Sequence, residues 1–295
     1  MKDLIAGIDL GGTKISSGIM TKDGKILSIR TIPTFADRGV EVVTDRIALC
    51  FFEACKIAKV DLSNIRCVGI GAPGPVDPKT GFVNNPPNLV GWEKVNLKKI
   101  MGKKLSKKIM LENDANCAAL AELFFGAGKK YRNFVYVTIS TGIGAGIIID
   151  KKLYSGANGS AGEVGHMIID FNSRYKCGCG KIGHLEGLAS GTAISKIYNI
   201  SPIELSKNAR KKDKNSLKII NEVGHLIGLG FTNLVNLLNP EAIIVGGGVS
   251  NIGSPLFSAI KKSVKENALA DVKIIKAKLK NNVGVIGAAS LCISQ

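Results

Sequence analysis

The sequence predicts an α/β protein made of two related halves that face each other across a cleft. Its 295 residues exceed one simple core and suit two domains. A strand, a glycine turn, a returning strand, a polar turn and a third strand occur twice, roughly 130 residues apart, which indicates duplication of a whole unit. In the first half, helical and strand patterns then alternate, as is typical of α/β domains.

In the first half, short apolar runs bounded by glycine or polar residues predict strands, and apolar residues at helical spacing predict helices. Five of the nine prolines fall between positions 73 and 87, so a long loop is expected there. We expect strands at 4–10, 14–20, 25–32, 67–71 and 109–111, and helices at 40–60 and 115–125.

The second half repeats the opening pattern and then becomes mainly helical. We expect strands at 134–139, 144–149 and 242–245, and helices at 193–198, 202–210, about 217–238 and 283–293. The expected domains are a small one, 1–117 with 283–295, and a large one, 118–282. A cleft between two such domains is a frequent place for ligand sites.

The net charge of +17 has two explanations. A basic chain can bind nucleic acid or another polyanion, or its lysines can coat a solvated surface. The basic runs are short, scattered and free of interleaved aromatic residues, so we favour the second explanation and expect no nucleic-acid partner. The resulting field would still help to attract an anionic nucleotide.

Nothing in the sequence resembles a targeting signal or a membrane segment, and we expect a cytoplasmic protein without a membrane partner. The longest apolar stretch, 134–149, is too short and too rich in glycine to span a bilayer. Five of the seven cysteines are scattered, which argues against a disulfide framework.

The first glycine turn carries residues suited to phosphate binding. In Asp9-Leu10-Gly11-Gly12-Thr13-Lys14, a turn without side chains lets backbone N–H groups approach phosphate oxygens. Thr13 and Lys14 add a hydroxyl and a positive charge, and Asp9 is placed to hold Mg²⁺ through water. An ordinary glycine hairpin is the alternative.

A second glycine turn occupies the matching position of the second half. It contains Thr141, Gly142 and Gly144 within the run 140–146. Two such turns at equivalent places in a duplicated fold would hold one polyphosphate from both sides. Gly247 and Gly248 end a later apolar strand, where backbone can approach a flat base or a ribose closely, although a plain strand-to-helix turn explains them equally well.

The segment Glu112-Asn113-Asp114 joins a strand end to a helix start. Asp114 has the commonest residue type for a helix N-cap, which is the simpler explanation. The adjacent amide of Asn113 favours a second role: a carboxylate fixed at a strand end can accept a proton from a hydroxyl that the neighbouring amide orients.

Two histidines and two cysteines fall within 19 residues, and the chain has three histidines in all. The ligands His166, Cys177, Cys179 and His184 suit a tetrahedral structural Zn²⁺ site. A redox pair or two idle thiols would leave the two histidines unexplained. The metal would hold the acidic residues on either side of the loop close to the imidazoles.

Together these motifs resemble the ROK family (repressors, open reading frames and sugar kinases) over nearly the whole chain. The resemblance rests on Asp9-x-Gly11-Gly12-Thr13-Lys14, Gly71-Ala72-Pro73-Gly74, Asn113-Asp114, the signature from Gly142 to His166, and the cysteine loop that ends at Glu186. It implies the duplicated actin-like ATPase (ribonuclease H-like) fold, an ATP-dependent sugar kinase, and a homodimer or higher homo-oligomer.

The resemblance also implies roles for individual residues. Asp114 would be the catalytic base, the glycine turns would hold ATP, and His166 would contact sugar with one ring nitrogen and zinc with the other. The residues implied to contact sugar hydroxyls are Asn88, Asn113, Glu163, His166 and Glu186. The family loop usually has a third cysteine where this chain has His184; histidine is also a good zinc ligand.

We therefore expect transfer of the ATP γ-phosphoryl group to a hexose, with glucose at O6 as the first choice. N-acetylmannosamine, N-acetylglucosamine and fructose are alternative acceptors. A sugar-sensing repressor is a rival within the family, but such proteins carry an N-terminal helix-turn-helix, and this chain reaches its first strand by residue 4.

Overall fold

The computed structural model describes residues 4–280 and 282–293, which pack into two units. The first unit comprises the chain up to Lys129, Lys152–Ala161, and the chain from Leu279 on; the second comprises Lys130–Lys151 and Gly162–Lys278. These two packing units differ from the domains expected from the sequence, whose boundaries were placed at 117/118 and 282/283. Those domain boundaries stay a prediction. In the described residues, no helix is both long and apolar enough to cross a membrane.

The first unit is built on a five-stranded sheet with the order β3-β2-β1-β4-β8. Strands β1, β2 and β3 are antiparallel neighbours, whereas β1, β4 and β8 run parallel. The strands are β1 (Leu4–Leu10), β2 (Lys14–Thr21), β3 (Ile26–Pro33), β4 (Ile65–Ala72) and β8 (Lys108–Asn113). In this register Asp9 pairs with Gly71, and Gly71 with Glu112, so the motif residues stand at the carboxyl ends of adjacent strands.

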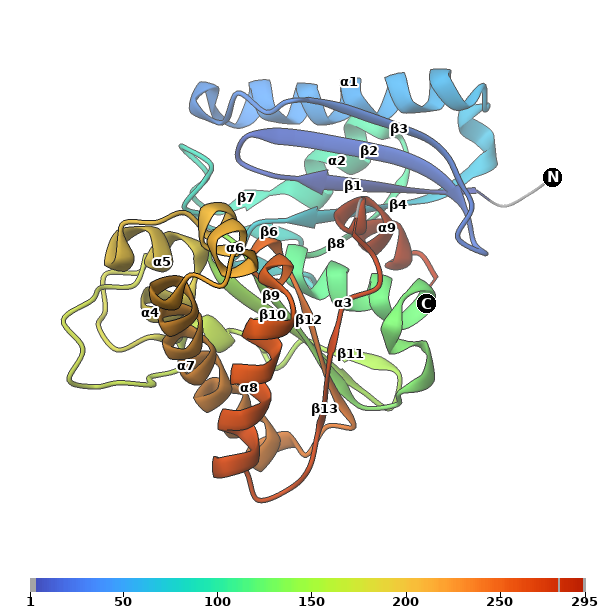
Figure 1. Cartoon of the computed structure of the whole chain (residues 1–295). Coiled ribbons are helices and arrows are strands. Elements are labelled where there is room, and N and C mark those ends of the chain that lie inside the picture. The colour runs from blue at the N-terminus through green and yellow to red at the C-terminus, as the bar shows by residue number, and fades with distance from the viewer. Residues whose placement is uncertain (1–3, 281, 294–295) are drawn as a thin grey trace. The chain divides into compact units, whose positions relative to one another are not determined.

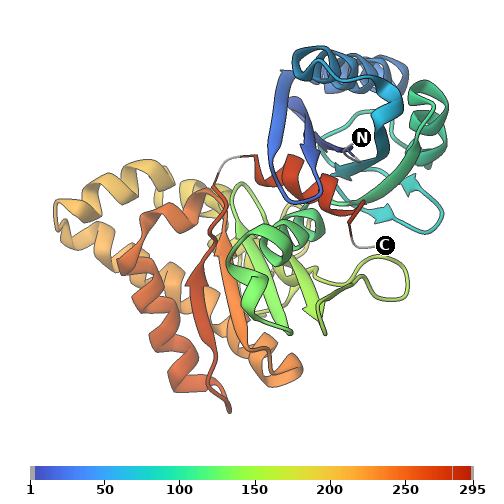
Figure 2. The same cartoon turned by 90° about the vertical axis from the view of Figure 1, so that its right-hand side faces the viewer.

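Helices cover both faces of this sheet (Figure 1). On one face, α1 (Gly39–Ala58) and α2 (Leu97–Leu105) bury Phe51 and Met101 against strand residues such as Ile8. On the other face, α9 (Val283–Ser290) and α3 (Asp114–Phe125) pack Ile286 and Ala121 against Ile5 of β1. Figure 2 shows α9 against this face, and the helix crosses β2, β1 and β4, because the paired residues Gly18, Gly7 and Gly69 all lie against it.

Helix α9 lies unusually close to the sheet because glycines face it. A Cβ built on Gly7 would lie 1.9 Å from the carbonyl oxygen of Val285, and one on Gly69 would lie 1.7 Å from that of Ala288. A disulfide between Cys67 of β4 and Cys292, just after α9, joins the two elements covalently. The structure thus pairs two of the cysteines that the sequence analysis treated as scattered.

Smaller elements complete the first unit. A three-stranded sheet of β5 (Val76–Asp77), β6 (Phe82–Val83) and β7 (Val95–Asn96) occupies the proline-rich region. The 3₁₀ helices of the whole chain, as far as it is described, are η1 (Ala36–Arg38), η2 (Leu62–Asn64), η3 (Ala127–Lys130), η4 (Val164–His166) and η5 (Gly248–Ile252).

The second five-stranded sheet has the order β11-β10-β9-β12-β13. Its strands are β9 (Phe134–Ile139), β10 (Ile143–Ile149), β11 (Lys152–Tyr154), β12 (Ala242–Gly246) and β13 (Lys273–Lys276). As in the first sheet, the central strand pairs antiparallel with the next strand of the chain and parallel with a later one. The expected duplication and the α/β fold class are therefore confirmed.

The helices of the second unit are α4 (Leu185–Ala189), α5 (Gly191–Tyr198), α6 (Pro202–Arg210), α7 (Lys214–Leu238) and α8 (Ser254–Asn267). Glycines again permit close packing: a Cβ on Gly224 of α7 would lie 2.5 Å from that of Ala259 in α8. Helices α2 and α8 and strand β13 were not among the expected elements, because their lysine-rich sequences blur the apolar period.

Candidate functional site

The first glycine turn closes through a hydrogen bond from the Gly11 N–H to the Lys14 carbonyl, 3.0 Å long. Gly12 packs against Asn88, since a Cβ at position 12 would lie 2.7 Å from the Asn88 Cβ. Asp9 is half-buried, and burial raises the pKa of its carboxyl while Lys14 opposes the shift. The turn therefore offers backbone N–H groups, a hydroxyl at Thr13 and a carboxylate near the same place.

The corner between β8 and α3 presents Asn113 and Asp114 together. Asn113, and not Asp114, is the N-cap of α3: its side-chain oxygen accepts from the Ala115 N–H at 2.9 Å. Asp114 is the first helical residue and accepts from the same N–H at 2.7 Å. A Cβ on Gly74 would lie 3.0 Å from the Asn113 amide nitrogen, so the loop after β4 reaches this corner.

The second glycine turn is tied to the helices that follow it. Its Ser140 N–H donates to Gly142 at 2.8 Å, the Gly191 N–H donates to Ser140 at 2.7 Å, and the Thr192 N–H donates to Thr141 at 3.3 Å. Gly142 lies directly against Glu186, because a Cβ there would lie 2.4 Å from one of its carboxylate oxygens. Gly144 lies within β10, paired with Thr138.

A cavity of about 810 Å³ adjoins this second turn inside the second unit. Gly248 lines it, and Gly247 beside it has φ +83° and no room for a side chain, because a Cβ would lie 2.3 Å from the Ile139 carbonyl oxygen. The other lining residues are Ser140, Thr141, Gly191, Thr192, Ser195, Lys196, Ser201, Pro202, Ile203, Ser206, Lys207, Arg210, Val249, Asn251 and Ile252.

Most of these lining residues were missed by the sequence analysis, because α5 and α6 carry no recognisable binding motif. The apolar wall of Pro202, Ile203 and Ile252 suits a flat heterocycle. Lys196, Lys207 and Arg210 add positive charge, and none of the described residues that line the cavity is acidic. The cavity can therefore hold a nucleoside whose phosphates extend toward Thr141.

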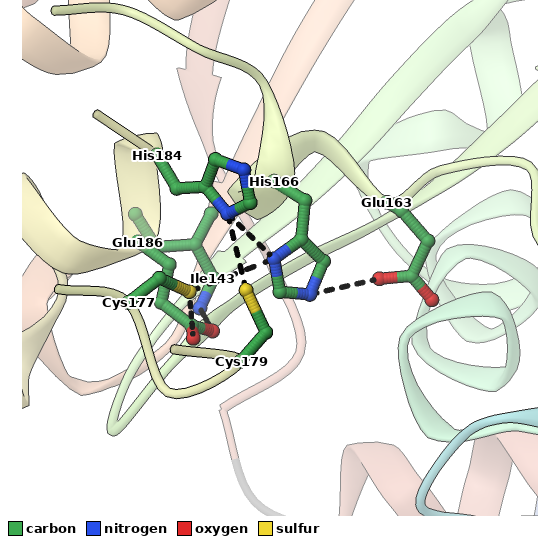
Figure 3. Close-up of polar contacts among 7 residues, drawn as sticks. All are labelled: Ile143, Glu163, His166, Cys177, Cys179, His184 and Glu186. Carbon is green, nitrogen blue, oxygen red and sulfur yellow. Dashed lines mark hydrogen bonds and ion pairs between the residues drawn. The ribbon is translucent and has the colours of Figure 1, made fainter. Parts of the chain in front are cut away.

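The two histidines and two cysteines converge as expected (Figure 3). Their four ligand atoms lie within 4.8 Å of one another. The Nδ1 atoms of His166 and His184 are 3.3 Å apart, and each lies near a thiol sulfur: His166 at 3.6 Å from Cys177 and His184 at 3.3 Å from Cys179. Tetrahedral Zn²⁺ bonds would require about 3.4 Å between nitrogens and about 3.6 Å between nitrogen and sulfur, so these residues fit zinc.

The protonation of these ligands also matters. Burial, with smaller contributions that include the neighbouring Glu186, raises the pKa of the Cys177 thiol to about 12. Burial lowers the pKa of His184, which favours the neutral imidazole that a metal needs. Zinc binding would therefore displace a proton from Cys177, since metals bind the thiolate.

Acidic residues lie on either side of this cluster. Glu163 lies 3.8 Å from Nε2 of His166, the ring nitrogen that faces away from the cysteines. Glu186 accepts a hydrogen bond from the Ile143 N–H at 3.0 Å and another from the Cys177 thiol at 3.2 Å. Glu186 thus connects the cysteine loop to the second glycine turn, a contact that sequence spacing did not reveal.

The expected residues therefore gather at two places, one in each unit. The first unit carries Asp9, Gly11, Gly12, Thr13, Lys14, Asn88, Asn113 and Asp114 on adjoining loops and strand ends. The second unit carries Thr141, Gly142, Gly144, Glu163, His166, Cys177, Cys179, His184, Glu186, Gly247 and Gly248.

Known proteins share both the sequence and the fold. A glucokinase of Thermotoga maritima is 34% identical over 97% of this chain and 96% of its own. A xylose repressor of Caldicellulosiruptor bescii is 31% identical over 98% of this chain and 78% of its own. The crystal structure of a ROK family glucokinase from Streptomyces griseus, in complex with glucose and AMPPNP, is 32% identical, covers 98% of both chains and has a TM-score of 0.83.

The ROK family model matches residues 5–295. Its sugar kinases have the actin-like ATPase fold, and the two matching sheets described above have that topology. The chain therefore belongs to the ROK family.

Proposed function

We propose that this protein transfers the γ-phosphoryl group of ATP to a hexose, with glucose as the acceptor and O6 as the attacking hydroxyl. The observation that carries the proposal is the corner of Asn113 and Asp114, where a carboxylate stands on the first turn of a helix beside a capping amide. The glucokinase relative and the Streptomyces griseus complex support the same reaction class.

Asp114 acts as the general base. As O6 attacks the γ-phosphorus, the hydroxyl proton passes to the Asp114 carboxylate, the bond from phosphorus to the bridging oxygen breaks, and ADP leaves. Little covalent work falls to the protein in such a reaction, so positioning and electrostatics dominate. The carboxylate is held by the Ala115 N–H, which fixes its direction before substrate binds.

The nucleoside occupies the cavity of the second unit, with its ribose or base near Gly248. The backbone of the turns that carry Gly12 and Gly142 contacts the phosphates, and Thr13 and Thr141 add hydroxyl groups. Bound Mg²⁺ would offset phosphate charge, and Asp9 is the carboxylate that would hold it through water.

Sugar hydroxyls are recognised by Asn88, Asn113, Glu163, His166 and Glu186. Zn²⁺ would bind His166 through Nδ1, as the cluster distances support, which leaves Nε2 beside Glu163 for sugar. A zinc-bound Cys177 is a thiolate and no longer donates to Glu186, so Oε1 of Glu186 becomes an available acceptor.

We assign the zinc a structural role, with His166, Cys177, Cys179 and His184 as its ligands. Four protein ligands close the coordination shell and leave no open position for catalysis. The metal would hold the loop between His166 and Glu186 in one conformation.

A coupled ATP assay across a hexose panel tests the proposal. We expect the highest kcat/KM with glucose, and phosphorus NMR should find the product phosphate at O6. Higher kcat/KM with N-acetylmannosamine, N-acetylglucosamine or fructose would replace glucose as acceptor, and no turnover with any sugar would refute the kinase proposal.

A sugar-responsive repressor is the second candidate, because the xylose repressor matches 98% of this chain. The corner of Asn113 and Asp114 favours an enzyme. Electrophoretic mobility shifts at several salt concentrations separate the two: specific DNA binding that survives competition would favour the repressor. The homodimer and the cytoplasmic location stay predictions; sedimentation velocity tests the first.

A further inference from the structure

Glu112 precedes the proposed catalytic corner and is almost completely buried, with 4% of its surface exposed. Its carboxylate accepts three hydrogen bonds within the first unit. Oε1 accepts from the Asn113 N–H at 2.8 Å and from the Asn116 side-chain amide at 2.9 Å, and Oε2 accepts from the Ser155 hydroxyl at 3.2 Å. Burial raises the pKa of Glu112 despite these bonds.

A buried carboxylate is costly, because its charge loses hydration that neutral donors only partly replace. An apolar residue would fill the same place in a strand end at lower cost. The position of Glu112 therefore calls for an explanation beyond packing, and the groups that it binds supply one.

Two of those groups lie on either side of Asp114 in the chain. Asn113 caps α3, and Glu112 holds the backbone N–H of that capping residue. Asn116 is 1% exposed, and its side-chain oxygen has no hydrogen-bond partner among the residues that the structure describes. Its amide is therefore oriented through the one bond to Glu112, which fixes the first turn of α3 on which Asp114 stands.

The third group comes from a distant part of the chain. Ser155 lies in the segment Lys152–Ala161, which belongs to the first unit. The segment also contacts β5, because a Cβ on Gly159 would lie 2.6 Å from the carbonyl oxygen of Val76. Glu112 thus joins the catalytic corner to the segment that leads into Gly162 and Glu163.

We propose that Glu112 is a positioning residue for the reaction, which holds Asp114 and Asn113 in their working orientation through Asn116, the Asn113 backbone and Ser155. The inference rests on the proposed kinase function. Glu112 itself touches no substrate; it acts through the two residues that do.

Steady-state kinetics of Glu112 variants test this inference. Glu112→Ala removes the common acceptor, and we expect kcat to fall on the order of 10²-fold, the scale of a small misplacement of a catalytic group. KM for glucose and ATP should change less than about threefold, since the ligands' own contacts remain. Glu112→Gln should restore most of kcat, because its oxygen still accepts from Asn113 and Asn116 while its amide donates to the Ser155 hydroxyl.

Glu122 of α3 provides a matched control. It is also buried and accepts two backbone hydrogen bonds, from the N–H groups of Ala127 at 2.6 Å and Leu279 at 2.8 Å, but at the far end of α3. Glu122→Ala should lower the melting temperature and leave kcat within about twofold of wild type. An equal loss of kcat in both alanine variants would mean that general destabilisation is the cause and would overturn the inference.

Two milder variants keep the test decisive if Glu112→Ala does not fold. Asn116→Leu and Ser155→Ala each remove one donor at nearly constant volume, and each should lower kcat severalfold, with recovery in Ser155→Thr. Normal kcat in both variants contradicts the inference. Asp114→Ala separates the proposed function from the positioning role. If Asp114→Ala retains activity, the proposed base is wrong. If Asp114→Ala is inactive and Glu112→Ala is fully active, only the positioning role of Glu112 is wrong.

Discussion

The two units share one sheet topology, but their cysteines are arranged differently. In the first, a disulfide joins β4 to the turn after α9, across 225 residues of sequence. In the second, two cysteines and two histidines gather within one loop. A disulfide connects distant parts of the chain, whereas the proposed metal site would order a local segment, so the two related sheets carry different candidate means of fixing nearby loops.

The proposed chemistry is divided in the same way. The first unit holds the proposed base, Asp114, and the second holds three of the five residues that we assign to sugar recognition, all beside the cysteine loop. Variants of Asp114 should therefore act mainly on kcat, and variants around the cysteine loop mainly on sugar KM.

The largest effect is expected at Asp114. Asp114→Asn keeps the oxygen that accepts from the Ala115 N–H, so the fold should be unchanged, but an amide cannot take the proton from O6. We expect kcat to fall by about 10²–10⁴-fold with little change in the KM for glucose. Steady-state kinetics alongside a thermal melt checks this. Turnover near the wild-type rate would show that the carboxylate is no base.

The next largest effect concerns the cluster of the second unit. Cys177→Ser replaces a thiolate by a poor ligand, and we expect zinc affinity to fall by at least about 10–100-fold and the KM for glucose to rise. Metal analysis of the purified protein and glucose kinetics are the measurements. Cys50→Ser, at a buried free thiol of the first unit, is the control and should retain metal. Full zinc content in Cys177→Ser would remove this residue from the ligand set.

The disulfide should matter for stability more than for chemistry. Replacing Cys67 and Cys292 together by serine releases α9 from β4, and we expect a loss of about 2–4 kcal/mol in the free energy of unfolding. Chemical denaturation with and without reductant measures this. Reductant should lower the free energy of unfolding of the wild type but have no effect on the first unit of the double variant. An unchanged free energy of unfolding in the reduced wild type would mean that the bond does not constrain the unfolded chain.

The sequence predicted those parts of the two units that local pattern determines. The strand at 134–139 was predicted with its observed ends, because a run of β-branched and aromatic residues is bounded by polar residues. The helix at 202–210 was likewise predicted, and Ser201 caps it. The convergence of His166, Cys177, Cys179 and His184 was predicted because these residue types are rare in the chain and close in sequence.

Long-range contacts could not be predicted in the same way. No spacing rule connects Cys67 to Cys292, and nothing in the sequence indicates that Ser155 reaches Glu112. The sequence analysis considered helix capping only for Asp114, whereas Asn113 is the N-cap; both residue types cap helices, and only backbone geometry separates them. The cavity wall formed by α5 and α6 could not be predicted either, because it arises from the packing of these helices.

The smallest expected effect is a pH-dependent one in the second unit. Glu241 accepts backbone hydrogen bonds from Arg132 at 2.6 Å and Asn133 at 2.8 Å, which lower its pKa. A carboxyl whose pKa is lower in the folded state stabilises the fold above its unfolded pKa of about 4.5, and this stabilisation disappears as the pH falls through the folded pKa. Melting temperatures of wild type and Glu241→Gln should therefore differ at neutral pH and converge in acid. As a control, Glu266→Gln, at an exposed pair with Lys262, should have the melting temperature of the wild type at every pH. If the difference in melting temperature between wild type and Glu241→Gln persists unchanged in acid, the effect comes from packing and not from charge.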